Sequence, residues 1–390
     1  MNPGGSLGGA ERSMVDLMDS LLAQAGIEIP VLLFNDGPLV GELERRGLPV
    51  RVLPLPPPLL HLGEGLVGGG LRGTLQVLPR LVLAGLALVG FLPRLRRAVA
   101  ALRPDIVHSN GIKAHLLLCL AGLSAPLVWH IRDFVGLRPL MARLLRYASR
   151  RARGAITVSK AVGEDATRVL GDRFPVWPIY DGINVGQFAD VRNGKGPQAR
   201  VRVGLIGTFA RWKGHSVFLQ AASKLVHERK RSDVRFLIVG GPIYDTLGSQ
   251  FTVEELTAMA ATLNLTSHVE FVPFQPDVTE AYRRVDVVVH ASVNPEPFGR
   301  TIVEGMACGL AVVAMRAGGA AELFTDGVDA VGAGPGSVDE MAAAIERLLD
   351  DEGLRRRLGE NGQRTVRERF DLSRLASEVL KFYAEVAPKI

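Results

Sequence analysis

Cysteine, aromatic residues and long apolar runs are all scarce in this sequence. Its two cysteines, Cys119 and Cys308, stand far apart and lack the spacing of a zinc site, which argues against a disulfide framework or structural metal and fits a reducing cytoplasm. The longest uncharged apolar run, residues 81–92, has 12 residues, whereas a helix that spans a bilayer needs about 20. Aromatic residues make up only 6% and no basic run is interleaved with them, so nucleic acid is not an expected partner.

The positive charge is concentrated in the first half of the chain. Residues 1–200 hold 24 Lys and Arg against 15 Asp and Glu, while residues 201–390 hold 22 against 25. A basic half attracts phosphorylated substrates or anionic lipid. The first residues do not have the pattern of a signal peptide, so we expect a cytoplasmic protein.

Strand-like apolar runs alternate with helical patterns along the whole chain, which is typical of a parallel α/β architecture. The length of 390 residues favours two domains. We expect an N-terminal domain over residues 1–190, a second over 191–370, and a helix over 371–390 that returns to the first. The expected strands are residues 29–34, 49–54, 105–109, 126–131 and 154–159 in the first series, and 202–208, 234–241, 269–274, 285–292 and 310–315 in the second.

The start of the chain lacks an element that this architecture needs. Residues 4–24 are a glycine-containing loop that leads into a helix, with Met14, Leu17, Met18 and Leu21 at helical spacing. Such a loop normally follows the first, central strand of a doubly wound domain. Only three residues precede it here, so we expect the coding sequence to begin upstream of Met1.

The stretch NPEPFGRTIVEG, residues 294–305, places Glu296 and Glu304 around the start of a helix near Gly299. The free N–H groups at a helix N-terminus bind anions, and two buried carboxylates can accept hydrogen bonds from the hydroxyls of one ligand. The alternative is one glutamate that caps the helix and one that faces solvent.

A second pair of charged residues, Arg211 and Lys213, follows the first strand of the second domain. Loops beyond the carboxyl ends of parallel strands are where doubly wound sheets bind ligands. Two cations there can neutralise a diphosphate without a metal. The alternative is a solvated basic pair.

Together with GGAER (8–12), Lys213-Gly214, FLIVGG (236–241) and VEFVPF (269–274), the segment from Glu296 to Gly327 resembles glycosyltransferase family 4. This resemblance covers nearly the whole chain. It implies the GT-B fold, in which two Rossmann-like domains face a cleft and a C-terminal helix crosses back, and a retaining transfer from a nucleotide-diphosphate sugar of UDP or GDP type, with no metal cofactor.

The resemblance also implies roles for individual residues. Glu296 contacts the donor sugar and is a catalytic candidate with His130, which ends the strand at 126–131. The remaining donor-binding residues are Gly8, Gly9, Arg211, Lys213, Phe298, Gly299, Arg300, Thr301 and Glu304. The acceptor-side candidates are His108, Asn110 and Asp133, for which polar loop residues without a ligand are the alternative.

Two departures from the family pattern stand out besides the missing strand. Gly207-Thr208 stands where the family has Gly-Arg, so a phosphate-binding arginine is absent from its usual place, and Arg211 is the candidate to replace it. Asp181-Gly182 replaces the family's Asn-Gly, which turn geometry tolerates.

Residues 137–154 form a basic amphipathic pattern, with Leu137, Met141, Leu144 and Leu145 on one face. Such a helix either lies on an anionic membrane or packs on its own domain with solvated arginines. The apolar residues 59–97 favour the membrane, so we expect a peripheral protein on the inner face of the membrane with a polyprenyl-linked or other saccharide acceptor.

The resemblance thus implies a metal-independent, retaining hexosyl-type glycosyltransferase, which we expect to act in cell-surface polysaccharide synthesis. Two other functions stay open: a catalytically impaired nucleotide-binding or scaffold subunit of the same fold, and a sugar-nucleotide epimerase.

Overall fold

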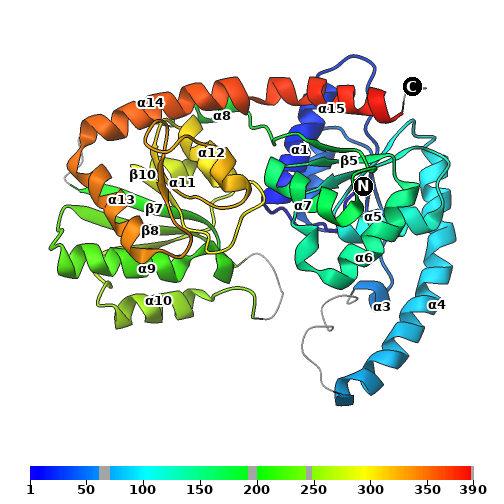
Figure 1. Ribbon diagram of the computed structural model, residues 1–390, viewed down its shortest axis with the longest axis horizontal. Helices are drawn as coiled ribbons and strands as arrows, with labels where there is room; N and C mark the ends of the chain where they lie inside the picture. Colours follow the sequence, from blue (N-terminus) through cyan, green and yellow to red (C-terminus); the bar gives the residue numbers. More distant parts are fainter. Residues whose placement is uncertain (61–70, 192–199, 243–247, 388–390) are drawn as a thin grey trace. The chain divides into compact units, whose positions relative to one another are not determined.

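The computed structural model describes residues 1–60, 71–191, 200–242 and 248–387, with the side chains of residues 71–81 left out. The chain divides into two compact units (Figure 1). Unit 1 comprises Met1–Val158, Val162–Ile179 and Ala376–Ile390, and unit 2 comprises Ser159–Ala161 and Tyr180–Leu375. The chain therefore enters unit 2 and comes back to unit 1 at its end.

Unit 1 holds two parallel sheets with helices packed around them. Its strands are β1 (Val31–Leu33) and β2 (Val50–Val52) in one sheet, and β3 (Val107–Asn110), β4 (Leu127–Ile131), β5 (Gly154–Thr157) and β6 (Val176–Pro178) in the other. Its helices are α1 (Gly9–Leu22), α2 (Pro38–Glu44), α3 (Pro57–Leu60), α4 (Leu71–Ala101), α5 (Ile112–Ala121), α6 (Pro139–Ala148), most of α7 (Lys160–Leu170) and most of α15 (Leu372–Val386).

The first residues of the chain lie between these two sheets. Asn2 forms an isolated parallel bridge with Leu33 of β1, and the main chain of Met1 is hydrogen-bonded to His108 and Asn110 of β3. The helical spacing of α1 is confirmed, since Met14, Leu17, Met18 and Leu21 are all buried.

Unit 2 holds one six-stranded parallel sheet in the order β12-β11-β10-β7-β8-β9. Its strands are β7 (Val201–Thr208), β8 (Val234–Gly241), β9 (Val269–Pro273), β10 (Val287–His290), β11 (Ala311–Met315) and β12 (Val331–Ala333). Its helices are α8 (Val185–Phe188), α9 (His215–Ser223), α10 (Val253–Thr262), α11 (Val278–Arg283), α12 (Arg300–Ala307), α13 (Val338–Asp350) and α14 (Glu352–Arg369). The crossover between β9 and β10 makes this a doubly wound sheet, whose ligand sites lie beyond the carboxyl ends of the strands.

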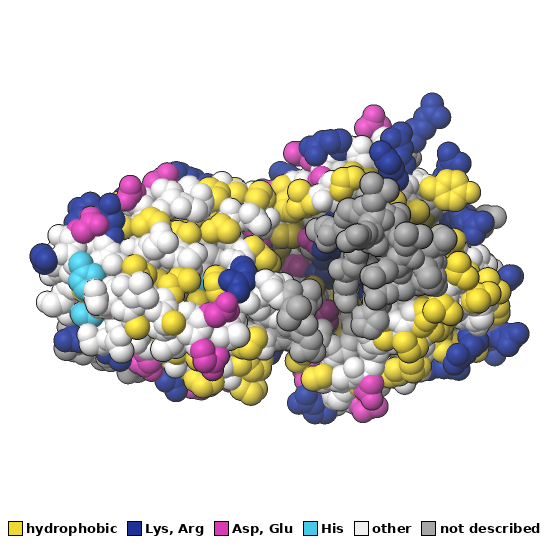
Figure 2. Space-filling view, turned by 90° about the horizontal axis from the view of Figure 1, so that it is seen from below, with side chains coloured by type: hydrophobic (Ala, Val, Ile, Leu, Met, Phe, Trp, Pro, Cys, Tyr) yellow, Lys and Arg dark blue, Asp and Glu magenta, His cyan; other side chains and the backbone are white. Residues whose placement is uncertain are grey.

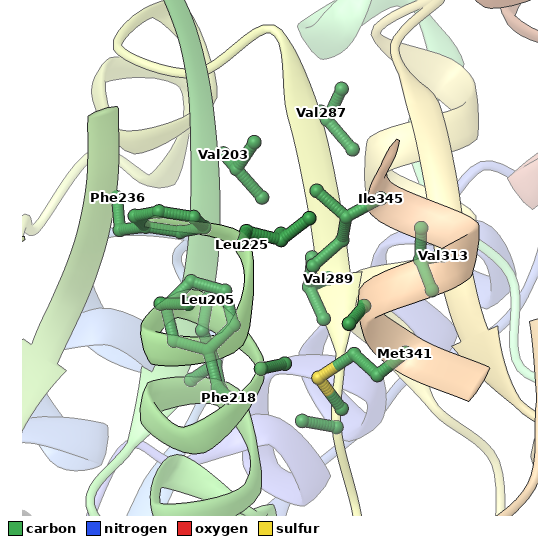
Figure 3. Packing of buried hydrophobic residues seen from close by; sticks show 14 of the residues in the cluster. Val203, Leu205, Phe218, Leu225, Phe236, Val287, Val289, Val313, Met341 and Ile345 are labelled. Atoms are coloured by element: carbon green, nitrogen blue, oxygen red, sulfur yellow. The ribbon is translucent and has the colours of Figure 1, made fainter. Parts of the chain in front are cut away.

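Continuous valine-rich strands build the core of unit 2. Strands buried on both faces read as unbroken apolar runs, as in the run from Val287 to Val289 of β10. Figure 3 shows Leu205 and Val289 from the sheet packing with Phe218 of α9 and Met341 of α13. This packing fixes the carboxyl ends of β7 and β10, where the charged side chains of the site begin.

All ten strands expected from the sequence are present, and β6 and β12 are two more. The amphipathic helix expected at 137–154 is shorter, since α6 ends at Ala148. Of its expected apolar face, Leu145 is fully buried while Leu137 and Leu144 are exposed. Part of the apolar run expected over 59–97 falls on residues 61–70, which lie outside the described residues.

Candidate functional site

The carboxylate of Glu296 is the centre of a buried polar cluster in unit 2. Lys213 Nζ donates to its Oε1 at 2.5 Å, and His290 Nε2 and Ser292 Oγ donate to its Oε2 at 2.5 and 2.6 Å. The residue is only 7% exposed. An ionised carboxylate has about four acceptor sites, so this cluster uses three of them and one remains for a ligand hydroxyl.

Local strand geometry brings His290 and Ser292 to the carboxylate. Side chains two residues apart on an extended segment point to the same side, and His290 ends β10 with Ser292 just beyond it. The Nδ1 atom of His290 is buried and has no hydrogen-bond partner within the described part of the chain.

Glycines at two places let the loops close around Glu296. A Cβ added to Gly319 would lie 2.0 Å from the carbonyl oxygen of Pro297, and Gly319 N donates to Glu296 O at 2.8 Å. A Cβ on Gly214, which has a φ of +77°, would lie 1.9 Å from the carbonyl oxygen of Ala291. These close approaches hold the turn that carries Lys213 against the end of β10.

Charge decides the protonation state of Glu296. Burial alone would raise the pKa of this carboxyl, but the Lys213 ammonium and the hydrogen bonds from Lys213 and His290 outweigh it and hold the pKa well below its usual range. The carboxylate is therefore ionised at every physiological pH.

The start of α12 follows this cluster in the chain. Gly299, with a φ of +103°, precedes the first helical residue, Arg300, while Phe298 is buried against Phe370 at a ring distance of 6.1 Å. Thr301 is half-buried in the first turn. The N–H groups of this first turn and the helix dipole favour an anion there, as the sequence predicts.

Glu304 is held by protein groups in this structure. Tyr282 Oη donates to its Oε2 at 2.7 Å and Arg300 Nε to its Oε1 at 2.6 Å. Burial, aided by this carboxylate, raises the pKa of Tyr282, so the phenol stays neutral and donates. The structure thus rejects the reading of Glu304 as a solvent-facing residue.

The structure does not bring Arg211 into the Glu296 cluster. Its guanidinium pairs with Glu255 at 2.7 Å, donates to Gly248 O at 3.0 Å and lies over the ring of Phe251. We predicted that Arg211 replaces the family's missing arginine, but its guanidinium pairs with Glu255 of α10. The cation that contacts Glu296 is Lys213.

In unit 1 three polar side chains form a chain of hydrogen bonds at the carboxyl ends of β3 and β4. Tyr383 Oη lies 2.5 Å from His108 Nδ1, and His108 Nε2 lies 3.1 Å from His130 Nδ1. Arg132 Nη2 is 3.3 Å from the same His130 Nδ1. His130 is only 2% exposed, and its Nε2 has no hydrogen-bond partner within the described part of the chain.

Donor and acceptor rules assign the protons in this chain. An arginine can only donate, so Nδ1 of His130 accepts and its proton is on Nε2. His108 Nε2 then donates to His130, and its Nδ1 accepts the hydroxyl proton of Tyr383. Burial, followed by nearby positive charge, lowers the pKa of both histidines well below the usual range, so both are neutral. The result is a buried N–H on His130 that can donate to a ligand oxygen.

Of the remaining candidates in unit 1, Asn110 contacts the histidine chain, whereas Asp133, Gly8 and Gly9 have other surroundings. Asn110 Oδ1 accepts from Arg132 Nε at 3.2 Å and so joins the histidine chain. Asp133 is exposed and pairs with Arg138 at 3.6 Å, away from His130. Gly8 N is bonded to the Glu11 carboxylate at 3.1 Å at the start of α1, and Gly9 is exposed beside it.

Sequence reasoning missed His290, Ser292, Tyr282 and Tyr383 as members of these clusters. The spacing of His290 and Ser292 at the end of an apolar strand could have indicated that both side chains point to the same side as a neighbouring site. Tyr282 and Tyr383 come from helices whose packing the sequence does not reveal.

The described residues contain neither a metal-binding cluster nor a membrane-spanning helix. No group of three or more His, Cys, Asp or Glu side chains there is placed to hold a metal ion. None of the helices in that part of the chain combines the length and apolar character needed to cross a bilayer.

Two family models together match most of the chain. The model of Glycosyltransferase Family 4 matches residues 7–187, and that of Glycosyl transferases group 1 matches residues 191–365. The chain therefore belongs to the family 4 type of glycosyltransferases, and its two units have the GT-B fold.

Among solved structures, Anabaena Alr3699/HepE in complex with UDP-glucose is 26% identical, with a TM-score of 0.79 and 98% of each chain covered. The alpha-D-kanosaminyltransferase of Streptomyces kanamyceticus is 25% identical over 89% of this chain and 98% of its own. The D-inositol 3-phosphate glycosyltransferase of Corynebacterium kroppenstedtii is 30% identical over 47% of this chain. That match spans 42% of the Corynebacterium protein, less than half of its length.

Proposed function

We propose that this protein transfers a sugar from a nucleoside-diphosphate donor to an acceptor hydroxyl, with retention of the anomeric configuration and without a metal ion. The observation that carries the proposal is the buried Glu296 carboxylate, ionised by Lys213 and placed beyond β10 just before the start of α12. Similarity to HepE, whose structure was determined with UDP-glucose, supports a uridine-type hexosyl donor.

Unit 2 supplies the groups that this donor needs. A hydroxyl of the transferred sugar donates to the remaining acceptor site of Glu296, while Lys213 and the first-turn N–H groups of α12 stabilise the negative charge that develops on the leaving diphosphate. Glu304 takes the ribose hydroxyls in exchange for one of its present partners, Arg300 or Tyr282. Each hydrogen bond to a charged acceptor contributes about 1.5–3 kcal/mol.

Unit 1 supplies the N–H of His130 as a positioning donor to an oxygen of the sugar or acceptor. Because Arg132 and His108 both donate to Nδ1 of His130, its proton is on Nε2, and the imidazole donates and does not remove a proton. The acceptor's proton then leaves with the diphosphate oxygen in a front-side displacement, and the protein contributes orientation and charge stabilisation.

The acceptor side of the proposal rests on an exposed apolar surface of unit 1. We name it the α4–α6 apolar face; it consists of Val82, Leu83, Leu86 and Val89 of α4, Leu120 of α5, and Leu137, Leu140, Leu144 and Tyr147 of α6 and the turn before it. Leu86 is 67%, Val89 71% and Tyr147 72% exposed. α5 packs against both α4 and α6, so these side chains belong to neighbouring helices.

The charge around this face fits an anionic lipid surface. α4, α5 and α6 contain no acidic residue, and Arg96, Arg97, Arg143 and Arg146 are exposed on them. Figure 2 shows hydrophobic side chains gathered at the right-hand edge of the view, beside Lys and Arg. An apolar surface with a basic rim binds the headgroup region of anionic membranes, which supports a polyprenyl-linked saccharide acceptor at the inner face of the membrane.

The test of the donor half is thermal stabilisation by UDP, GDP, ADP and dTDP, repeated with Glu296→Gln and Glu304→Ala. We expect a shift with UDP that Glu304→Ala reduces. Incubation with UDP-sugars and lipid extracts, followed by analysis of released UDP and of the anomeric configuration of the product by NMR, tests the transfer. An isomerised sugar nucleotide without a glycoside would show an epimerase, and nucleotide binding without turnover would show a scaffold subunit.

A further inference from the structure

The carboxylate of Glu304 has a protein donor on each of its oxygens. Arg300 is the first residue of α12 and Glu304 the fifth, so their side chains lie on one face of the helix. Arg300 Nε donates to Glu304 Oε1 at 2.6 Å, and Tyr282 Oη of α11 donates to Oε2 at 2.7 Å. Glu304 itself is only 3% exposed. A ribose hydroxyl can therefore reach this carboxylate only if one of the two donors leaves.

The two donors differ in how readily they can leave. Tyr282 is fully buried, and its ring packs edge-on against Phe188 at a centroid distance of 6.1 Å. Its departure would open a cavity in the core. The side chain of Arg300 is 16% exposed, and its long stem has several rotatable bonds. Arg300 is therefore the donor that a ligand displaces, and Oε1 is the oxygen that becomes free.

The pair of Arg300 and Glu304 is not arranged to stabilise α12. An acidic residue followed four positions later by a basic one complements the helix dipole, and this pair has the reverse order. Arg300 also places a positive charge in the first turn, at the positive end of the dipole, and no acidic residue within that turn compensates it. Helix stability therefore does not account for an arginine at this position.

A diphosphate at the start of α12 needs more positive charge than Lys213 supplies. The ammonium of Lys213 is 2.5 Å from Glu296 Oε1, so this carboxylate already balances it. The guanidinium of Arg211 is paired with a residue of α10. The side chains of a helix lean toward its N-terminus, so Arg300 can turn from Glu304 to an anion that lies beside the first turn.

We propose that Arg300 is a switch in the donor site, an inference that rests on the function proposed above. In the free protein its guanidinium occupies Glu304 Oε1. When a nucleoside diphosphate binds, a ribose hydroxyl takes this oxygen and Arg300 turns to the diphosphate, where it shares the negative charge with Lys213. Tyr282 remains on Oε2 and holds the carboxylate in place. A nucleoside without phosphates offers Arg300 no new partner, so the site discriminates against it.

The experiment measures the dissociation constants of UDP, by calorimetry, and of uridine, by ligand-observed NMR, for the wild type, Arg300→Met and Arg300→Lys. We expect Arg300→Met to bind UDP about 10- to 100-fold more weakly, because it loses a charge-assisted contact with the phosphates. The same variant should bind uridine about 2- to 5-fold more tightly, because Glu304 Oε1 is no longer occupied. Arg300→Lys keeps the charge and should bind UDP more tightly than Arg300→Met.

The opposite changes for the two ligands distinguish a switch from other roles of Arg300. Weaker or unchanged binding of uridine by Arg300→Met would show that Arg300 does not close the Glu304 site, and tighter binding of both ligands would show that it does not contact the diphosphate. Either result would overturn the proposal. As a control, Arg283→Met removes an exposed arginine paired with Glu280 on α11 and should change neither constant. A wild type that binds none of UDP, GDP, ADP and dTDP would instead reject the proposed donor site, and the switch with it.

Discussion

At the residue scale, each unit holds a buried polar group whose partners fix its protonation state. Glu296 is ionised because Lys213 and His290 contact it, and His130 is neutral because burial and Arg132 oppose a second proton. The two groups are prepared for opposite tasks, acceptance of hydrogen bonds and donation of one. Substitution of a partner therefore tests each group without altering it.

Lys213→Ala should remove the main source of charge compensation for Glu296. We expect the pKa of Glu296 to rise because burial is no longer offset, and the free energy of unfolding to fall by about 1–3 kcal/mol. UDP should no longer raise the melting temperature. The matched control is Lys224→Ala, which removes a half-buried lysine paired with Asp339 in the same unit and should leave UDP binding unchanged. Normal UDP binding by Lys213→Ala would remove Lys213 from the donor site.

Tyr383→Phe should remove the hydrogen bond that orients His108 and so loosen the contact of His108 with His130, while Arg132 keeps the proton of His130 on Nε2. The lost hydrogen bond to His108 contributes about 0.5–1.5 kcal/mol, so we expect the turnover rate to fall about 3- to 10-fold with an unchanged KM for the donor. His130→Ala removes the hydrogen-bond donor itself, so we expect the turnover rate to fall more than about 100-fold. A Tyr383→Phe enzyme with normal turnover and pH profile would show that the hydrogen-bond chain does not position His130.

At the element scale, tight turns rather than long helices place the groups that we propose bind the donor. The turn from Arg211 to Gly214 and the loop at Gly318 and Gly319 both approach a neighbouring backbone more closely than a Cβ allows. These glycines carry no functional group, but the position of Lys213 and Glu296 depends on them.

Gly214→Ala should therefore abolish donor binding through a shift of the turn. The positive φ alone costs about 1–3 kcal/mol, and the new Cβ would also meet the carbonyl of Ala291. Gly336→Ala is the control, because Gly336 has a similar φ of +71° but open space around its Cβ position. We expect both variants to lose stability and only Gly214→Ala to lose the UDP-induced thermal shift. Equal UDP binding by the two would contradict this view of the turn.

The α4–α6 apolar face can be tested through its exposed side chains. Leu86→Glu combined with Val89→Glu adds negative charge where an anionic bilayer would lie, so sedimentation with phosphatidylglycerol vesicles should fall several-fold. Fold stability should not change, since both side chains are exposed. Val328→Glu, at an exposed valine of unit 2, is the control and should sediment normally. Full vesicle binding by the double variant would reject the face as a membrane contact.

Most of the elements were predictable because long parallel strands read as apolar runs. The two strands that the sequence did not indicate, β6 and β12, are three residues long and lie at sheet edges, where Pro178 and Gly332 weaken the pattern. The two glutamates that the sequence singled out, Glu296 and Glu304, are both buried and hydrogen-bonded. The partner of Arg211 was not, because Glu255 is 44 positions away and only tertiary packing brings it near.

At the scale of the whole molecule, the histidines whose pKa is lowered by burial divide unevenly between the units. Burial lowers the pKa of His108, His115 and His130 in unit 1, that of His115 to about 3, and that of His215 in unit 2 to about 4. Their unfolded-state pKa is about 6.5. Below that pH these histidines bind protons in the unfolded chain but stay neutral in the native units. The free energy of unfolding therefore falls as the pH falls.

Unit 1 should consequently lose stability faster than unit 2 on acidification. Each such histidine contributes a loss of up to about 1.4 kcal/mol per pH unit below pH 6.5, and three lie in unit 1 against two, His215 and His268, in unit 2. Urea unfolding followed by hydrogen exchange at pH 7.5, 6.0 and 5.0 should show amides of β4 opening progressively more than those of β8. His115→Phe, which keeps a ring against Trp129, should flatten this dependence. An equal increase in amide opening for β4 and β8 on acidification would refute this prediction.

The return of α15 to unit 1 has a consequence for protein synthesis. Residues from Ala376 onward belong to unit 1, where Ala376 N is bonded to Ser20 Oγ at 3.0 Å and Phe382 packs on Trp177. The ribosome makes these residues only after the whole of unit 2. The surface of unit 1 that α15 covers, around Ser20 and Trp177, therefore stays exposed while some 200 residues are added. The hydroxyl that orients His108, that of Tyr383, is therefore made only after unit 2. A nascent chain thus has unit 2, the proposed donor-binding unit, complete before unit 1 can close around the histidine chain.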